Sequence, residues 1–136
     1  MYGALDISTS GLIAQRTRME AISANIANQE TYTDKTGRNV PFARRVVYFA
    51  AGSPGASSAS GQAMGVHATV GKEARSTQRY DPDNPLANSE GYVKYPDINS
   101  TQEMMNMYEA SRAYEANLVA AEATKTMVAQ ALRLLA

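Results

Sequence analysis

The 136-residue sequence has no cysteine and no tryptophan, a single histidine, and no excess of charge, because 13 basic residues balance 13 acidic ones. Without cysteine the chain can form neither a disulfide nor a thiolate metal site, which fits a protein that crosses or occupies an oxidising compartment. The balanced charge disfavours nucleic acid or an anionic membrane as a partner. The sequence also lacks an apolar run of about 18 residues and a positively charged leader, so we expect neither a membrane span nor a cleaved export signal.

Residues that could carry chemistry are equally scarce. A catalytic triad would have to use the single His67, so we expect a structural role for it on a strand. Asp81 and Asp83 suggest a calcium loop, but Pro85 and Leu86 stand where a ligand and a glycine are required. We therefore predict no enzyme activity, no catalytic or metal-binding residue, no cofactor and no small-molecule substrate.

The last 37 residues, from Ser100 to Ala136, contain neither glycine nor proline. Their apolar residues recur at helical spacing and predict one helix about 54 Å long, too long for one small domain to cover. Ser100 and Glu103 have the spacing of a capping box at its start. Counted in heptads, the a positions are Met104, Ser111, Leu118, Lys125 and Leu132, and the d positions are Met107, Tyr114, Ala121, Val128 and Leu135. We expect this a/d seam to pack mainly as core.

A second face of the same helix consists mainly of small residues, which let another backbone approach closely. One partner helix could not cover both faces, so we expect this second face to contact other molecules. The glutamates of the helix, Glu103, Glu109, Glu115 and Glu122, are expected to be solvated. The second face comprises Ala110, Ala113, Asn117, Ala120, Thr124, Met127, Ala131 and Leu134.

Residues 3–28 predict a second amphipathic helix. Its apolar residues repeat at intervals of seven, and Gly11 lowers its helix propensity. We expect it to gain its stability by docking against the C-terminal helix as an antiparallel coiled-coil pair. The predicted seam residues on this helix are Leu5, Leu12, Met19, Ile22 and Ile26.

The middle of the chain predicts short strands at residues 44–49, 66–70 and 91–96, and the stretch 72–79 either continues the second strand or pairs back on it. A loop rich in alanine, serine and glycine spans residues 50–65 and is expected to be flexible. The Arg44–Arg45 pair is expected on a solvated strand edge. A dense turn motif contains Asp81, Pro82, Pro85 and Gly91.

The predicted fold is therefore α+β, with long terminal helices and a small β-rich module inserted between them. The expected division is a helical domain of residues 1–30 and 99–136 and a β module of residues 31–98.

Two stretches carry a resemblance to a known family. Residues 4–28, ALDISTSGLIAQRTRMEAISANIAN, resemble the N-terminal motif of bacterial flagellar axial proteins and are most similar to the FlgC family of proximal rod proteins. The block YDPDNPLANSEGYVKYPDIN from Tyr80, followed by EMMNMYEASRAYEANL, resembles the second signature of the same family. The family usually has histidine where Asn84 stands, which puts a general role for that histidine in doubt.

The resemblance implies a structural subunit of the flagellar basal-body rod, located in the periplasm and exported without a cleaved signal peptide. It would pack helically with copies of itself and other rod proteins, with an adaptor at the membrane-ring and export-gate base as a further partner, transmit torque and form the export channel wall. Two alternatives stay open at this stage. One is a cytoplasmic helical adaptor or export chaperone, and the other is a small hydrolase that depends on His67.

Overall fold

The structure is a computed structural model that describes residues 2–52 and 65–135. It confirms two terminal helices with a small β module between them, so the predicted α+β class is correct. The elements in chain order are α1 (Tyr2–Ala27), β1 (Arg44–Ala51), β2 (Val66–Glu73), β3 (Ser76–Tyr80), β4 (Tyr92–Pro96) and α2 (Ser100–Leu135).

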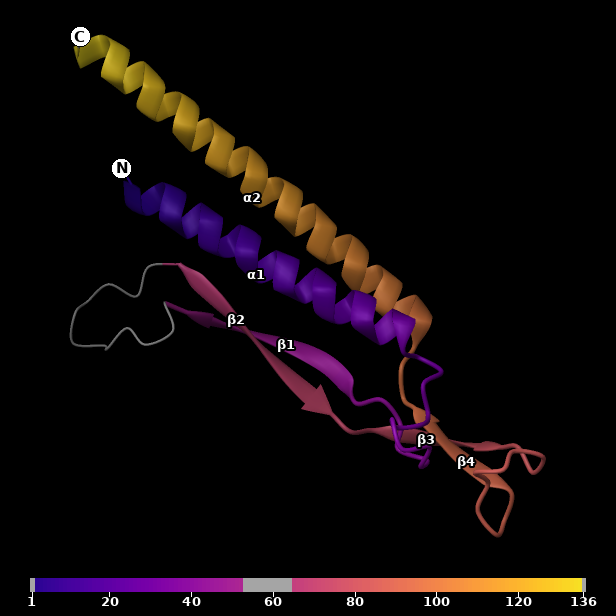
Figure 1. Cartoon of the computed structure of the whole chain (residues 1–136). Helices are drawn as coiled ribbons and strands as arrows, with labels where there is room; N and C mark the ends of the chain where they lie inside the picture. Colours follow the sequence, from indigo (N-terminus) through magenta and orange to yellow (C-terminus); the bar gives the residue numbers. More distant parts are fainter. Residues whose placement is uncertain (1, 53–64, 136) are drawn as a thin grey trace.

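Helix α1 is the middle layer of the molecule. Helix α2 runs antiparallel along one side of it, and the β1–β2 hairpin lies along another side (Figure 1). Small residues on α1 let both neighbours come close, and Ala14 and Ala21 are 1% and 3% exposed. Because two sides of α1 are covered, its sequence shows a weaker contrast between apolar and polar faces than a surface helix does.

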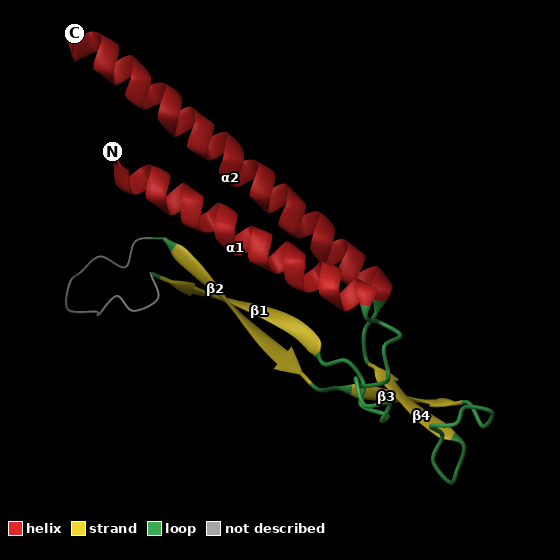
Figure 2. Cartoon of the chain, viewed as in Figure 1, coloured by secondary structure: helices red, strands yellow, loops and turns green. Residues whose placement is uncertain are grey.

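The strands form two separate antiparallel hairpins. Strands β1 and β2 pair from Arg44 with Glu73 to Ala51 with Val66. Strands β3 and β4 pair from Ser76 with Pro96 to Tyr80 with Tyr92, and this hairpin lies beyond the C-terminal end of α1 (Figure 2). The three predicted strands are confirmed. The uncertain stretch 72–79 divides, since β2 ends at Glu73 and β3 pairs with β4 instead of β2.

The predicted flexible loop 50–65 is only partly within the described residues, because 53–64 lie outside them. Ala50 and Ala51 belong to β1, so the loop begins later than predicted. Beyond the strand ends, Gly52 N–H donates to the carbonyl of Gly65 at 2.9 Å. A Cβ atom at Gly65 would lie 2.5 Å from Ser10 Oγ, so glycine is required where the hairpin meets α1.

The start of α2 differs from the prediction. Asn99 caps the helix, because its Oδ1 accepts hydrogen bonds from the N–H groups of Thr101 at 3.0 Å and Gln102 at 3.2 Å. Glu103 does not complete a capping box with Ser100. Its side chain turns into the protein, where two other partners bind the carboxylate, so the capping-box prediction is wrong.

The core is small for the length of the helices. The buried apolar side chains in the described part of the chain are those of Ala14, Ala21, Ile22, Val93, Pro96 and Ala110. Asn25 and Glu103 are buried with them, at 0% and 1% exposure. None of the helices, over the residues described, has the length and apolar character needed to cross a membrane.

Candidate functional site: helix faces and polar junction

The face of α2 that contacts α1 follows a heptad line from Glu103 through Ala110 and Asn117 to Thr124. Ala110 is 0% exposed, and α1 is the main element that α2 contacts. The helices come very close at Gly11, where an added Cβ atom would lie 2.9 Å from Asn117 Nδ2. Glycine at position 11 of α1 therefore makes room for the Asn117 side chain of α2.

This arrangement corrects the prediction for the small-residue face of α2. Ala110 is buried, and Ala113 and Asn117 are half-buried, although they were expected to contact other molecules. The reason is physical: α1 contacts both α2 and the hairpin and approaches α2 at a glycine, where large side chains would not fit. Of the same predicted face, Met127 and Leu134 are exposed.

The large apolar residues at the predicted a positions of α2 are exposed. Met104, Leu118 and Leu132 are 58%, 42% and 61% exposed, so they are not part of the core of the single chain. Among the predicted d positions, Met107, Tyr114 and Val128 are half-buried. As residues of an assembly surface, these side chains remain predictions.

The predicted seam residues of α1 are all at least partly covered. Ile22 is 5% exposed, and the others are half-buried, namely Leu5, Leu12, Met19 and Ile26. Met19 and Met107 line a groove of about 570 Å³ between the two helices, with the Arg16–Glu20 ion pair beside it. The Arg16–Glu20 pair lies within α1, whereas the ion pair from Arg18 Nη2 to Glu109 Oε2, at 3.3 Å, links the two helices.

The outer side of α2 carries an exposed apolar strip. Apart from the a positions above, its large side chains are 59–88% exposed. A group of exposed large apolar side chains is typical of a surface that another molecule covers. The additional members of the strip are Met105, Tyr108, Val119, Met127 and Leu134.

A buried polar junction joins α1, β1 and α2. Oε1 of Glu103 accepts hydrogen bonds from Arg44 Nε at 2.9 Å and Nη2 at 2.6 Å. Oε2 of Glu103 accepts from Asn25 Nδ2 at 3.0 Å. Arg44 Nη1 also lies 3.6 Å from Oε2 of Glu73 on β2. Both oxygens of the buried carboxylate are thus satisfied, and the charge is paired.

Sequence reasoning missed this junction. Arg44 was expected on a solvated edge and Glu103 on a solvated face, and these two predictions are wrong. No burial was predicted for Asn25, which lies in the last turns of α1. The heptad spacing could have indicated that Glu103 is buried. Glu103 stands seven residues before Ala110 and fourteen before Asn117, on the same face of the helix.

Two asparagine side chains form the backbone hydrogen bonds that a neighbouring strand would otherwise form. Asn25 Nδ2 donates to the carbonyl of Arg45 at 2.8 Å, and its Oδ1 accepts from Arg45 N–H at 2.7 Å. Asn39 bonds to Lys94 in the same way, at 3.1 Å and 3.2 Å. Each amide satisfies both backbone groups of one strand residue.

The predicted turn motif closes the β3–β4 hairpin. Asp81 N–H donates to the carbonyl of Gly91 at 2.9 Å. Gly91 has a φ of 80°, and a Cβ atom there would lie 2.9 Å from the ring of Tyr80. Asp81 and Asp83 are therefore turn residues as expected, with Pro82 and Pro85 between the strands.

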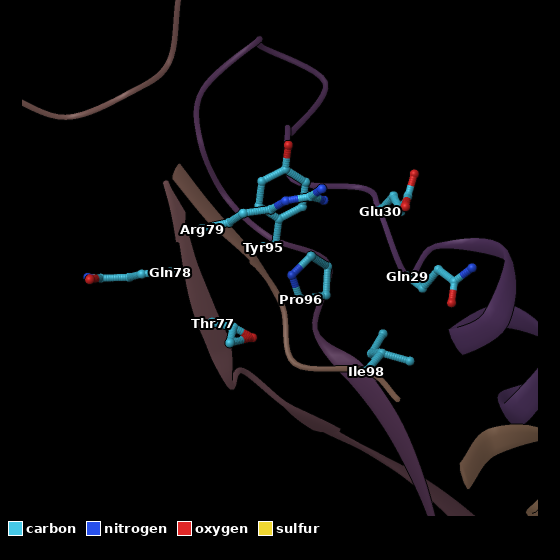
Figure 3. Close-up of a pocket in the computed structure, with 8 residues that line it drawn as sticks. All are labelled: Gln29, Glu30, Thr77, Gln78, Arg79, Tyr95, Pro96 and Ile98. Carbon is cyan, nitrogen blue, oxygen red and sulfur yellow. The ribbon is translucent and has the colours of Figure 1, made fainter. Parts of the chain in front are cut away.

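A pocket of about 390 Å³ lies at the base of this hairpin, with residues of β3, β4 and the loop after α1 around it (Figure 3). The guanidinium carbon of Arg79 lies 5.6 Å from the ring centroid of Tyr95, a cation–π contact. The Tyr95 ring also packs against Tyr32 at 4.6 Å between centroids. These contacts give Arg79, Tyr95 and Tyr32 a structural role in holding the hairpin in place.

The loop between α1 and β1 contains an acidic side chain with several donors. Asp34 Oδ1 accepts from the backbone N–H and the hydroxyl of Thr36 and from the N–H of Arg38. The hydrogen bond from the Thr36 side chain, followed by the backbone hydrogen bond from Arg38, lowers the pKa of Asp34 well below its usual value.

His67 has a structural contact. Its Nδ1 lies 2.9 Å from the carbonyl oxygen of Gly52 at the end of the β1–β2 hairpin. Among the residues described, no group of histidine and acidic side chains is arranged to hold a metal ion.

Comparison with known proteins gives matches at both ends and over the whole length. The family described as "Flagella basal body rod protein" matches residues 5–31, and "Flagellar basal body rod FlgEFG protein C-terminal" matches residues 89–134. The FlgC flagellar basal-body rod protein of Bacillus subtilis is 35% identical over 145 residues, which cover 98% of this chain and 97% of that protein.

Two further relatives also match over nearly the whole length of the chain. The FlgC protein of Aquifex aeolicus is 39% identical over 129 residues, covering 92% of this chain and 90% of the relative. That of Salmonella typhimurium is 35% identical over 133 residues, covering 95% and 93%. The matched regions include α1, α2 and the hairpins between them.

Proposed function

The chain belongs to the FlgC family of flagellar basal-body rod proteins, and we propose that it enters the rod through the exposed apolar strip of α2. As a member of this family it is a structural subunit of the flagellar basal body. The proposal rests on the observation that α1 covers only one side of α2. Its line from Glu103 to Thr124 packs on α1, while Met104, Leu118 and Leu132 remain largely exposed.

A helical rod needs surfaces that differ on the two sides of each contact, because a contact between identical surfaces ends at a dimer, whereas one between different surfaces can continue as an open helix. The strip on α2 and the Met19–Met107 groove are two such different surfaces on one chain. We propose that neighbours, both copies of this chain and other rod proteins, cover these surfaces, and that α1 and α2 act there as an antiparallel coiled-coil pair.

Further parts of the proposal follow from this role. Packed helices would transmit torque between subunits and form part of the export channel wall. Residues 1–30 and 99–136 would act as the helical domain of the subunit and residues 31–98 as its β module. The rod base would supply an adaptor at the membrane ring and export gate, and the chain would reach the periplasm without a cleaved signal peptide.

The alternative of a cytoplasmic adaptor or export chaperone is not favoured, because the relatives are rod proteins over nearly their whole length.

The test is Leu118→Asp in cells that lack the wild-type chain. Leu118 is 42% exposed, so a charge there costs little in the free subunit but is unfavourable once a neighbour covers it. We expect a folded, exported chain that is absent from purified basal bodies, and cells that do not swim. Ser89→Asp, in an exposed turn, is the control and should assemble normally. Normal basal bodies with Leu118→Asp would contradict the proposal.

A further inference from the structure

A crevice of about 480 Å³ lies where the three layers of the molecule meet. It is lined by residues of α1, by Phe49 on β1, by the start of β2 and by Asn117 on α2. None of the residues that line it carries a charge. Its apolar rim is accessible, since Ile7 is 46% and Phe49 is 43% exposed. The crevice is therefore suited to an uncharged occupant.

One buried polar atom in this crevice has no hydrogen-bond partner among the described residues. Gln15 Oε1 is buried, and it accepts no hydrogen bond from the described part of the chain. Asn117, which lies against Gly11, makes no hydrogen bond to residues 2–52 or 65–135 either. A buried acceptor without a donor is costly, so a native protein normally supplies a partner.

The same chain shows what such amides do when they are occupied. Asn25 and Asn39 each bond to both the N–H and the C=O of one residue in an extended strand. Gln15 and Asn117 offer the same donors and acceptors beside β1. Strand β1 pairs only with β2 among the described strands, so its second edge has no strand partner.

We propose that this crevice binds an extended, uncharged segment of a neighbouring rod subunit. The Gln15 and Asn117 amides bond to the backbone N–H and C=O groups of that segment, and its apolar side chains pack on Ile7 and Phe49. This inference rests on the proposed function, because it requires a neighbouring polypeptide. It places a second kind of contact in the assembly, separate from the outer strip of α2.

The competing occupant is water, which could satisfy Gln15 without any partner chain. The two occupants differ in what they cover. Water leaves the rim open to a reagent in the assembled rod, whereas a polypeptide segment shields Phe49.

The absence of cysteine makes the test direct, because one introduced cysteine is the only thiol of the chain. Phe49→Cys is made in the full-length chain, and its labelling by a maleimide is compared between free subunit and purified basal bodies. We expect labelling about tenfold slower or more in basal bodies, as for a site that opens only rarely. Ile7→Cys is a second probe if Phe49→Cys does not fold.

The role of the amides is tested by adding Gln15→Leu and Asn117→Ala to the Phe49→Cys chain. We expect the protection of Cys at position 49 to be lost, or the folded variant to be missing from basal bodies. The control Gln102→Leu, on an exposed position of α2, should leave protection and assembly unchanged.

Equal labelling in free and assembled chains, or protection that does not change when both amides are removed, would overturn the inference and leave water as the occupant. Failure of the proposed function gives a different result: the Leu118→Asp chain would form normal basal bodies, or the wild-type chain itself would be absent from them.

Discussion

Arg44 Nη2 lies 2.6 Å from Oε1 of Glu103, and Glu103 is 1% exposed. This pair connects the first residue of β1 with the first turn of α2. Asn25, in the last turns of α1, donates a hydrogen bond to the second carboxylate oxygen of Glu103. Three segments that are far apart in the sequence are thus held by one buried carboxylate. The docking of the hairpin and the closing of the helix pair are coupled at this point.

We predict that Arg44→Met strongly destabilises the chain. It leaves the buried carboxylate of Glu103 without its cation, and removal of one partner of a buried pair costs several kcal/mol. Because the Arg44 side chain is partly exposed, we expect a loss of about 2–4 kcal/mol in the free energy of unfolding. Urea unfolding followed by circular dichroism measures this loss.

The matched control is Arg45→Met. The side chain of Arg45 is exposed, its guanidinium carbon lies 5.8 Å from the ring centroid of Phe42, and only its backbone bonds to Asn25. Loss of the exposed cation–π contact should lower the free energy of unfolding by at most about 1 kcal/mol. Equal losses for the two variants would show that the pair with Glu103 is not the source of the stability.

The sequence was sufficient to predict the fold class, both helices and three of the four strands, but not the separate strand β3. The absence of glycine and proline after Ser100 determined the long helix, and alternating residues determined the strands. The resemblance of the two terminal blocks indicated the family. These signals are local, or lie in long contiguous patterns, and do not depend on how the elements pack.

The contact faces of the helices were beyond what the pattern could show. Leu118 is a large apolar residue at an a position and yet is exposed, whereas the charged Glu103 is buried. The cause is that α1 has two neighbours and comes close to α2 at Gly11, so the inner face of α2 needs small or paired polar residues. When a subunit also has surfaces for other chains, apolar residues outside its own core are not anomalies, and hydrophobicity alone cannot distinguish the two sets.

The loop around Asp34 should respond to acid. The pKa of Asp34 is lowered in the folded chain by hydrogen bonds from Thr36 and Arg38, so the folded state binds fewer protons than the unfolded state near the usual carboxyl pKa. The stability from this group is therefore full above that usual value and falls as the pH drops below about 4.

The measurement is the free energy of unfolding as a function of pH for the wild type and for Asp34→Asn. We expect the difference between the two chains to be constant above about pH 5 and to shrink as the pH falls below about 4. Asp83→Asn, in an exposed turn, is the control. A difference that grows toward low pH would contradict the direction of the pKa shift.

Gly11 and Asn117 should be energetically coupled. Alanine is favoured over glycine inside a helix by about 1 kcal/mol, but a Cβ atom at position 11 would lie 2.9 Å from Asn117 Nδ2 and force that side chain to move. In the wild-type background we therefore expect Gly11→Ala to change the free energy of unfolding by less than about 0.5 kcal/mol.

In an Asn117→Ala background the obstructing atoms are gone, and the same Gly11→Ala substitution should stabilise the chain by about 0.5–1 kcal/mol. An Asn106→Ala background, with an amide removed elsewhere on α2, should give the wild-type result. Urea unfolding of the single and double variants measures the coupling. If Gly11→Ala has the same effect in all three backgrounds, then the close approach of α1 and α2 at this point does not explain why glycine stands there. A coupling confined to the Asn117→Ala background would instead show that contact between the helices, and not helix propensity, sets the residue at position 11.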